Sequence, residues 1–166
     1  YFLVTLHRAE NVDDPTRLER LLHGLALVAD TYQEPMIVSL HPRTAHKLSE
    51  FGLSPQSGRV RLLDPLGFFD FVKLECNARC VLSDSGTVQE ECSIFKVPNV
   101  TLRDVTERAE TVECGSNILT GADPEMILQA VKVALHSSCD WAPPPEYLKS
   151  HVASAVVKII LGYRNR

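Results

Sequence analysis

The segment YFLVTLHRAENVDDPTRLERLLHGLALV, residues 1–28, contains a complete strand–loop–helix unit and decides the fold. Its opening run, Tyr1–Leu6, is continuously apolar over the length of a strand, as expected for a parallel strand with helices on both faces. Asp14 and Pro15 then stand where the N-cap and the first residue of a helix are expected. The inner stripe of that helix is formed by Leu18, Leu21, Leu22, Leu25 and Val28.

The same alternation of strand-length runs and helical patterns continues along the chain. Two final helices are predicted, from Asp123 to Ser137 and, after three consecutive prolines, from Tyr147 to Tyr163. The pattern predicts an α/β fold, a doubly wound six-stranded parallel sheet of Rossmann-like type, with strand order 3-2-1-4-5-6 and right-handed crossovers. The candidate strands are Tyr1–Leu6, Met36–Leu40, Val60–Leu63, Cys80–Ser83, Asn99–Leu102 and Asn117–Thr120.

Composition limits the class of protein. The 166 residues fit one domain, and 45% hydrophobic with 23% charged residues is typical of a soluble globular protein. The formal net charge of −4 argues against a nucleic-acid partner, and no stretch approaches the roughly 18 apolar residues of a membrane span. Five cysteines without a C-x-x-C pair indicate a reducing compartment, the cytoplasm. Because the chain opens inside a strand with Tyr1 rather than Met, we expect it to be cut from a longer protein.

Ligands of such sheets bind beyond the carboxyl ends of the strands, where the strand order reverses. Here that point lies between the first and fourth strands, so the polar loops that start at His7 and Asp84 should face each other. Ser85 and Gly86 would open a helix whose unpaired N–H groups and positive dipole end can hold a phosphate. The alternative is that Asp84 or Ser85 only caps that helix.

Charged residues near this point have two interpretations each. Glu90 and Glu91 lie in the second turn of that helix, where a carboxylate facing the cleft can accept both hydroxyls of a ribose, or the pair can form a solvated acidic face. Arg103 and Arg108, after the fifth strand, can clamp a phosphate with forked N–H donors. The alternative for both arginines is a surface ion pair with Glu107 or Glu110.

Apolar residues and a histidine complete the candidates. Leu66 and the cluster Phe68-Phe69-Asp70-Phe71 can give a flat base an apolar wall, although aromatic residues at this density are more often core. His41 follows the second strand. It is a candidate site residue, but it can equally be a surface histidine that caps a helix. No G-x-G-x-x-G, Walker, C-x-x-C or H-E-x-x-H motif is present, which argues against dinucleotide, nucleotide-triphosphate and zinc sites.

Several segments together resemble one family, the non-hydrolysing UDP-N-acetylglucosamine 2-epimerases, whose fold is similar to that of the two-domain GT-B glycosyltransferases. Their order and spacing match the family through nearly the whole chain. The segments are TLHRAEN (5–11), LDPL (63–66) with Phe71, SDSGTVQEE (83–91) and RDVTERAE (103–110). The resemblance implies that residues 1–166 are the C-terminal UDP-binding domain, one half of a GT-B fold, and that the N-terminal domain is absent from the chain.

The resemblance also implies roles for particular residues. His7 matches a residue implicated in catalysis, and Arg8 and His41 match positions of a regulatory site for a second UDP-sugar. The UDP-binding residues would be Leu66 and Phe71 at the uracil, Ser85 and Gly86 at the phosphates, Glu91 at the ribose and Arg108 at the pyrophosphate.

The implied reaction inverts C2 of the sugar without a cofactor or a metal, by elimination and re-addition of UDP. The acid–base carboxylates of the family belong to the absent domain, so the chain alone is expected to bind UDP weakly and to epimerise nothing. The full-length protein is expected to form a homodimer. Ala9, Thr87 and Ala109 replace a usual arginine, glycine and proline, and the HPRT segment (41–44) resembles a branch that includes epimerases of modified UDP-amino sugars.

Three other functions stay open from the sequence. A GT-B glycosyltransferase would grip a nucleotide sugar with a domain of the same plan but would need a separate acceptor. A non-catalytic UDP-sugar-binding module would bind reversibly without turnover. A flavodoxin-like interaction domain would leave the spaced match unexplained.

Overall fold

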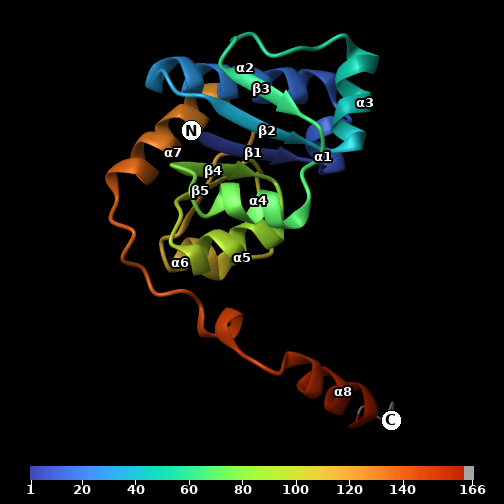
Figure 1. The fold of residues 1–166 in the computed structure, drawn as a ribbon, viewed down its shortest axis with the longest axis vertical. Coiled ribbons are helices and arrows are strands. Elements are labelled where there is room, and N and C mark those ends of the chain that lie inside the picture. Colours follow the sequence, from blue (N-terminus) through green and yellow to red (C-terminus); the bar gives the residue numbers. More distant parts are fainter. Residues whose placement is uncertain (163–166) are drawn as a thin grey trace.

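The computed structural model describes residues 1–162, and at its centre is a sheet of six parallel strands (Figure 1). The strands lie in the order β3-β2-β1-β4-β5-β6, and β1 is paired on both sides, so that Val4 lies between Val38 and Leu82. The predicted α/β fold and strand order are confirmed. The strands are β1 (Phe2–Leu6), β2 (Met36–Leu40), β3 (Val60–Leu63), β4 (Cys80–Ser83), β5 (Asn99–Thr101) and β6 (Asn117–Leu119).

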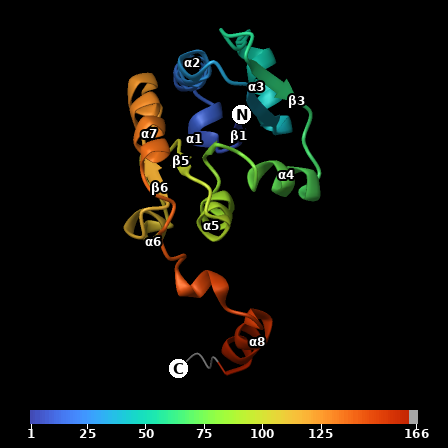
Figure 2. The same ribbon diagram turned by 60° about the vertical axis from the view of Figure 1, so that its left-hand side comes forward.

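Helices cover both faces of the sheet, as Figures 1 and 2 show. On one side α2 and α7 pack together against the sheet, and on the other side lie α4 and α5. The helices of the described residues are α1 (Ala9–Val12), α2 (Pro15–Tyr32), α3 (Pro42–Phe51), α4 (Phe68–Glu75), α5 (Gly86–Phe95), α6 (Ala109–Glu113), α7 (Pro124–His136) and α8 (Val152–Gly162), with a 3-10 helix, η1 (Pro145–Leu148).

The double covering explains why the strands are apolar at nearly every position. Residues Phe2, Val4 and Leu6 of β1 enter the core under α2 and α7, whereas Leu3, which points the other way, enters the core under α4 and α5. A strand with one solvated face would instead alternate apolar and polar residues.

Capping residues set the ends of the long helices as the sequence predicts. The Asp14 side chain accepts hydrogen bonds from Thr16 N (2.9 Å) and Arg17 N (3.4 Å), and Pro15 takes the first helical position of α2. Asp123 does the same for α7, where it accepts from Met126 N at 3.1 Å.

The C-terminal segment differs from the prediction of one helix from Tyr147 to Tyr163. A 3-10 turn ends at Leu148, and the backbone breaks at His151, whose φ is 58°, before α8 begins. That left-handed residue prevents a continuous helix. Tyr163 lies outside the described residues.

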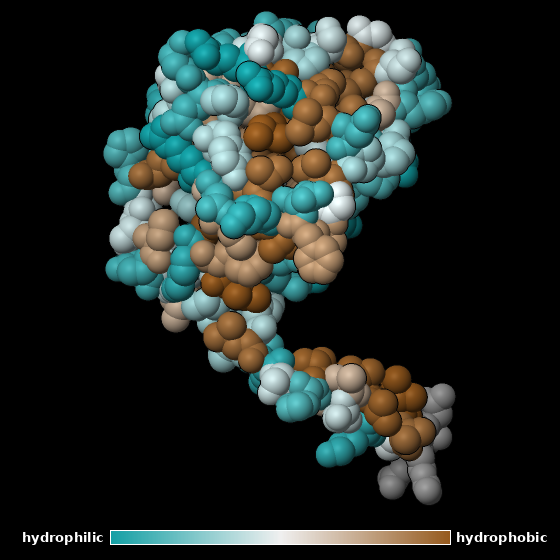
Figure 3. Space-filling model, in the orientation of Figure 1, coloured by the Kyte–Doolittle hydropathy of each residue, from teal (hydrophilic) through white to brown (hydrophobic). Residues whose placement is uncertain are grey.

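Helix α8 extends away from the rest of the molecule, and Figure 3 shows apolar side chains along it. Its exposed apolar residues are Val152, Val156, Val157, Ile159, Ile160 and Leu161. The connector before it is anchored by Trp141, whose indole N–H donates to Ser93 O at 3.0 Å. Within residues 1–162 no helix combines the length and the apolar character that crossing a membrane requires.

Candidate functional site

The carboxyl ends of β1 and β4 lie side by side, and the loops that follow them are joined through Asp84. Thr5 pairs with Ser83 in the sheet, so His7 and Asp84 leave the sheet at the same edge. The buried Asp84 carboxylate accepts hydrogen bonds from His7 N (3.1 Å to each oxygen) and Arg8 N (2.9 Å). The prediction that these two loops face each other is confirmed.

Asp84 also orients the His7 side chain. His7 Nδ1 lies 3.1 Å from Asp84 Oδ1, and no described residue hydrogen-bonds Nε2. Burial alone would raise the pKa of Asp84, but hydrogen bonds from His7, Arg8 N and Asn11 outweigh burial and lower it. An ionised Asp84 holds the proton of the imidazole on Nδ1, which leaves Nε2 available to a ligand. The interpretation of Asp84 as a helix cap is therefore wrong.

Asn11 is a site residue that sequence reasoning missed. It is completely buried, and its side-chain amide donates to Asp84 Oδ2 (3.1 Å) and to Leu102 O (2.8 Å). Its Oδ1 accepts from Arg17 Nε at 2.8 Å. Asn11 thereby ties α1 to the residues that follow β4 and β5. The sequence gives no signal for this role beyond a polar residue in the segment after the first strand.

The N-terminus of α5 is free to bind an anion. Ser85 is its N-cap residue, but its side chain makes no capping hydrogen bond, and Ser85 N itself donates to Ser83 Oγ at 3.0 Å. Asp84 is engaged by the β1 loop, so within residues 1–162 no side chain caps the first turn of α5. Unpaired N–H groups at a helix start favour a phosphate or a carboxylate.

Arg108 lies beside this helix start. A Cβ atom built on Gly86 would lie 3.7 Å from Arg108 Cζ and 3.7 Å from Nη2, so the guanidinium borders the first turn of α5. Arg108 Nε donates to Glu90, and this bond is the largest cause that raises the pKa of Arg108. Of the two sequence interpretations, an ion pair is present, but its partner is on α5 and not at Glu107 or Glu110.

Arg103 has a different environment and is not a ligand candidate. Its side chain is buried, and Nε donates to Glu10 at 2.8 Å while the two terminal nitrogens donate to Glu107 at 2.8 and 3.1 Å. Each forked donor is engaged with a carboxylate. Arg103 therefore ties the loop after β5 to α1.

The two glutamates of α5 do not form a solvated acidic face. Glu90 pairs with Arg108, and Glu91 is half-buried. The pKa of Glu91 is raised, chiefly by burial and then by the negative charge of Glu90. Glu91 is thus a carboxyl group at the boundary between the core and the surface.

The aromatic cluster divides between surface and core. Phe71 packs into the core under α4 and α5, as the core interpretation expects. Phe68 and Phe69 are 68% and 85% exposed, so the core interpretation is wrong for these two. Leu66 is half-buried, and its N–H donates to Ser39 Oγ at 3.3 Å.

The two residues assigned to a regulatory site lie next to His7. His41 caps α3, since its Nδ1 accepts from Arg43 N at 3.2 Å, and its ring centroid is 5.6 Å from that of His7. Arg8 Nε is buried without a hydrogen-bond partner in the described part of the chain. The structure therefore brings His7, Arg8 and His41 together at one edge.

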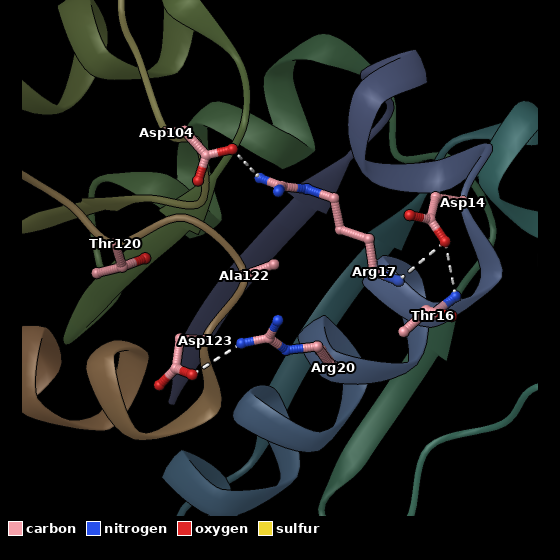
Figure 4. Close-up of a pocket in the computed structure, with 8 residues that line it drawn as sticks. All are labelled: Asp14, Thr16, Arg17, Arg20, Asp104, Thr120, Ala122 and Asp123. Atoms are coloured by element: carbon pink, nitrogen blue, oxygen red, sulfur yellow. Dashed lines mark hydrogen bonds and ion pairs between the residues drawn. The ribbon is translucent and has the colours of Figure 1, made fainter.

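A cavity of about 260 Å³ lies apart from these residues, at the start of α2 (Figure 4). Its arginines are already paired, Arg17 with Asp104 at 2.9 Å and Arg20 with Asp123 at 2.8 Å. Two paired arginines offer little to an anion. No group of three His, Cys, Asp or Glu side chains within residues 1–162 is arranged to hold a metal ion.

Comparison with known proteins identifies the family. Residues 1–161 match the family model described as UDP-N-acetylglucosamine 2-epimerase. A UDP-N-acetylglucosamine 2-epimerase of Methanocaldococcus jannaschii is 46% identical over 87% of this chain and 40% of its own length. A UDP-2,3-diacetamido-2,3-dideoxy-D-glucuronate 2-epimerase of Pseudomonas aeruginosa is 40% identical over 81% of this chain and 37% of its own length.

A solved structure shows the same relationship. The crystal structure of the M. jannaschii enzyme in complex with UDP-N-acetylglucosamine and UDP superposes with a TM-score of 0.91 and 42% identity, over 98% of this chain and 45% of that one. The chain thus spans less than half the length of these relatives. On the match over residues 1–161 and these identities, the chain belongs to the UDP-N-acetylglucosamine 2-epimerase family.

Proposed function

We propose that the full-length protein is a UDP-N-acetylglucosamine 2-epimerase, or an epimerase of a related UDP-amino sugar, and that residues 1–166 form its C-terminal UDP-binding domain. One observation carries the proposal. The uncapped start of α5, the Arg108 guanidinium beside it and the His7–Asp84 pair lie at the reversal point of the sheet, in a chain of this family.

In this proposal the diphosphate of the UDP-sugar lies against the first turn of α5. The free N–H groups that begin at Gly86 and the Arg108 guanidinium supply hydrogen bonds and positive charge. Ser85 lies at the same turn and adds its hydroxyl, which makes no capping bond.

The nucleoside then extends from the diphosphate toward α4. Glu91, one turn further along α5, accepts the hydroxyls of the ribose, and Leu66 and Phe71 border the uracil. Supporting this path, Phe71 and Val88 of α5 belong to one packed cluster, so α4 lies beside the helix that carries Glu91.

The chemistry at this half of the active site is departure and return of UDP. Breaking the bond between C1 and the diphosphate oxygen places negative charge on the leaving group. Donors that are fixed in advance where charge develops lower the barrier, and one good donor is typically worth about 3–4 kcal/mol. His7 Nε2, oriented by Asp84, assists this step, and proton transfer at C2 belongs to groups of the other domain.

Arg8 and His41 are proposed to bind a second UDP-sugar. Their support is the buried, unpartnered Nε of Arg8 and the 5.6 Å separation of the His41 and His7 rings. A ligand that contacts them would lie next to the catalytic histidine. We further propose that the protein is a cytoplasmic homodimer, and its five free cysteines support a reducing compartment.

The test is to incubate the full-length protein with UDP-N-acetylglucosamine in deuterated water and to follow the sugar by proton NMR. Reversible inversion with deuterium at C2 is expected. Loss of UDP only when an acceptor is added would identify a glycosyltransferase instead. Saturable binding with no turnover would identify a binding module.

A further inference from the structure

Glu75, the last residue of α4, is a buried acid that the proposed reaction does not use. Its side chain is completely inaccessible to solvent. Cys92 Sγ lies 3.4 Å from Glu75 Oε1, and no donor group among the described residues gives a hydrogen bond to Oε2. The surrounding cluster is apolar, with Val88 and Cys92 of α5 and the partly buried Leu74 of α4. A charged carboxylate is disfavoured in such a place.

The ionisable groups that face Glu75 come from α5. Burial and then the negative charge of Glu91 raise the pKa of Glu75 to about 8. Burial also raises the pKa of Cys92, so that thiol stays neutral, and the pKa of Cys80, on β4 beyond Cys92, rises to about 12. Arg108 is paired with Glu90, the neighbour of Glu91 on α5. Glu75 therefore carries a proton at neutral pH.

Glu75 shifts the pKa of Glu91 in the opposite direction to the other influences on that group. Burial and Glu90 raise the pKa of Glu91, whereas the Glu75 carboxyl group lowers it. That direction is the one expected when a protonated carboxyl group donates to an ionised one. The two acids can thus share one proton and one negative charge, with the charge on the less buried Glu91.

We propose that Glu75 is a positioning residue for ribose recognition, whose buried Oε2–H donates a hydrogen bond to the Glu91 carboxylate and holds it where it accepts both ribose hydroxyls. The inference rests on the proposed function, from which it takes the role of Glu91. The proposal gives Glu75 Oε2, which receives no hydrogen bond, the role of a donor. It also makes ribose recognition depend on one buried proton.

The experiment measures the affinity of the full-length protein for UDP and for 2′-deoxy-UDP by calorimetry across pH. The deoxy ligand keeps the base and both phosphates, so its affinity controls for their titration and for that of the other site residues. In the native protein the preference for UDP is expected to be about tenfold or more near pH 6.5. It should fall several-fold by about pH 9.5, when Glu75 loses its proton and repels Glu91.

Two substitutions separate the donor from the acid. Glu75→Gln keeps an N–H donor but cannot ionise, so it should keep the UDP preference at every pH. Glu75→Met removes the donor and should reduce the preference to nearly one at every pH. Glu125→Gln, an exposed glutamate on α7, is the matched control and should behave as the native protein does.

The outcomes distinguish failure of this inference from failure of the proposed function on which it rests. A native protein that binds UDP and 2′-deoxy-UDP equally near pH 6.5 would refute the role of Glu91, and with it the proposed ribose site. A clear preference that is independent of pH in the native protein would overturn the role of Glu75 and leave the ribose site standing. That second result needs no variant, so it decides the matter even if Glu75→Met does not fold.

Discussion

Two carboxyl groups in this molecule, Asp84 and Glu75, are equally buried and yet differ in charge. Both side chains are 0% exposed. Asp84 accepts hydrogen bonds from two backbone N–H groups, a histidine and an asparagine, and its pKa falls. Glu75 has one thiol contact and a neighbouring negative charge, and its pKa rises to about 8. The protonation state of a buried acid is therefore decided by its donors, because burial is the same in both cases.

The difference matches the places that the two acids occupy. Asp84 follows β4 at the edge where two polar loops meet, and those loops supply donors. Glu75 ends α4 against the apolar side of α5, where only Cys92 and Glu91 face it. One acid is charged and fixes His7, and the other is neutral and, in our inference, fixes Glu91.

The largest expected effect is on stability when Asp84 is removed. Asp84→Ala removes the acceptor of His7 N and Arg8 N and one of the two acceptors of the Asn11 amide, and loss of a buried charged partner costs roughly 3–5 kcal/mol. Urea denaturation of the full-length protein measures the free energy of unfolding. Asp104→Ala, which removes an exposed ion-pair partner of Arg17, is the control, and its cost should stay below about 1 kcal/mol. Equal small losses would show that the donors around Asp84 do not stabilise the fold.

The next effect concerns His7, the histidine that the charged Asp84 orients. His7→Asn should lower kcat by roughly 10²–10³ while the Kd for UDP changes little, because the role that we propose for His7 lies mainly in the transition state. The measurement is steady-state kinetics together with calorimetric UDP binding. His136→Asn, on the exposed end of α7, should leave both unchanged. Equal loss in kcat and in UDP affinity would make His7 a binding residue.

A smaller effect concerns the neutral acid and the pH dependence of stability. Since the pKa of Glu75 is about 8 in the folded protein and 4.5 ordinarily, the folded state binds a proton that the unfolded state has lost. Its contribution is complete below the unfolded pKa and is lost as pH rises through about 8. Relative to Glu75→Gln, the native protein should lose on the order of 2–4 kcal/mol of unfolding free energy between about pH 5 and pH 8.5.

The contribution of Asp84 to the free energy of unfolding depends on pH in the opposite direction, so Asp84 serves as the internal comparison. Its pKa is lowered, so its contribution is present at neutral pH and is lost only as pH falls through the folded value in acid. Urea denaturation across pH, in the native protein and in Glu75→Gln, measures both slopes. A pH-independent difference between the two proteins would show that Glu75 is already ionised in the folded state.

The sequence predicts the sheet well because its signals are local. The bounds of β2, β3 and β4 agree with the apolar runs, and the aspartate–proline starts of α2 and α7 are where their chemistry places them. Strand order follows from the general rules of parallel sheets. The predicted last helix fails at His151, where a left-handed residue has no marker comparable to glycine or proline.

The location of the site can be predicted from the sequence, but the pairing of its side chains cannot. The rule that strand ends meet at one edge brings His7 and Asp84 together although they are 77 residues apart. Nothing local distinguishes Arg103, which is buried between two glutamates, from Arg108, which borders α5. The burial of Glu75 is likewise set by how α4 packs on α5. Such pairings depend on tertiary contacts that spacing along one helix or loop does not specify.

The smallest expected effect concerns α5, which begins after Asp84 and carries Cys92, the residue in contact with Glu75. Gly86→Val should weaken UDP binding by about tenfold, because the valine methyl groups occupy the space between the first turn of α5 and the Arg108 guanidinium. The fold should persist. A Cβ at this position meets Arg108 at an ordinary contact distance of 3.7 Å, and Gly86 is not among the residues with positive φ.

The matched control for this substitution is Gly58→Val, because Gly58 has nothing within 4 Å of a built Cβ and also lacks a positive φ. Calorimetry with UDP and thermal unfolding would be measured for both variants of the full-length protein. Gly58→Val should bind UDP as the native protein does. If Gly86→Val folds and also binds UDP with native affinity, the diphosphate does not approach this turn. The unpaired N–H groups of α5 would then be satisfied by water, and Arg108 would serve only to hold Glu90.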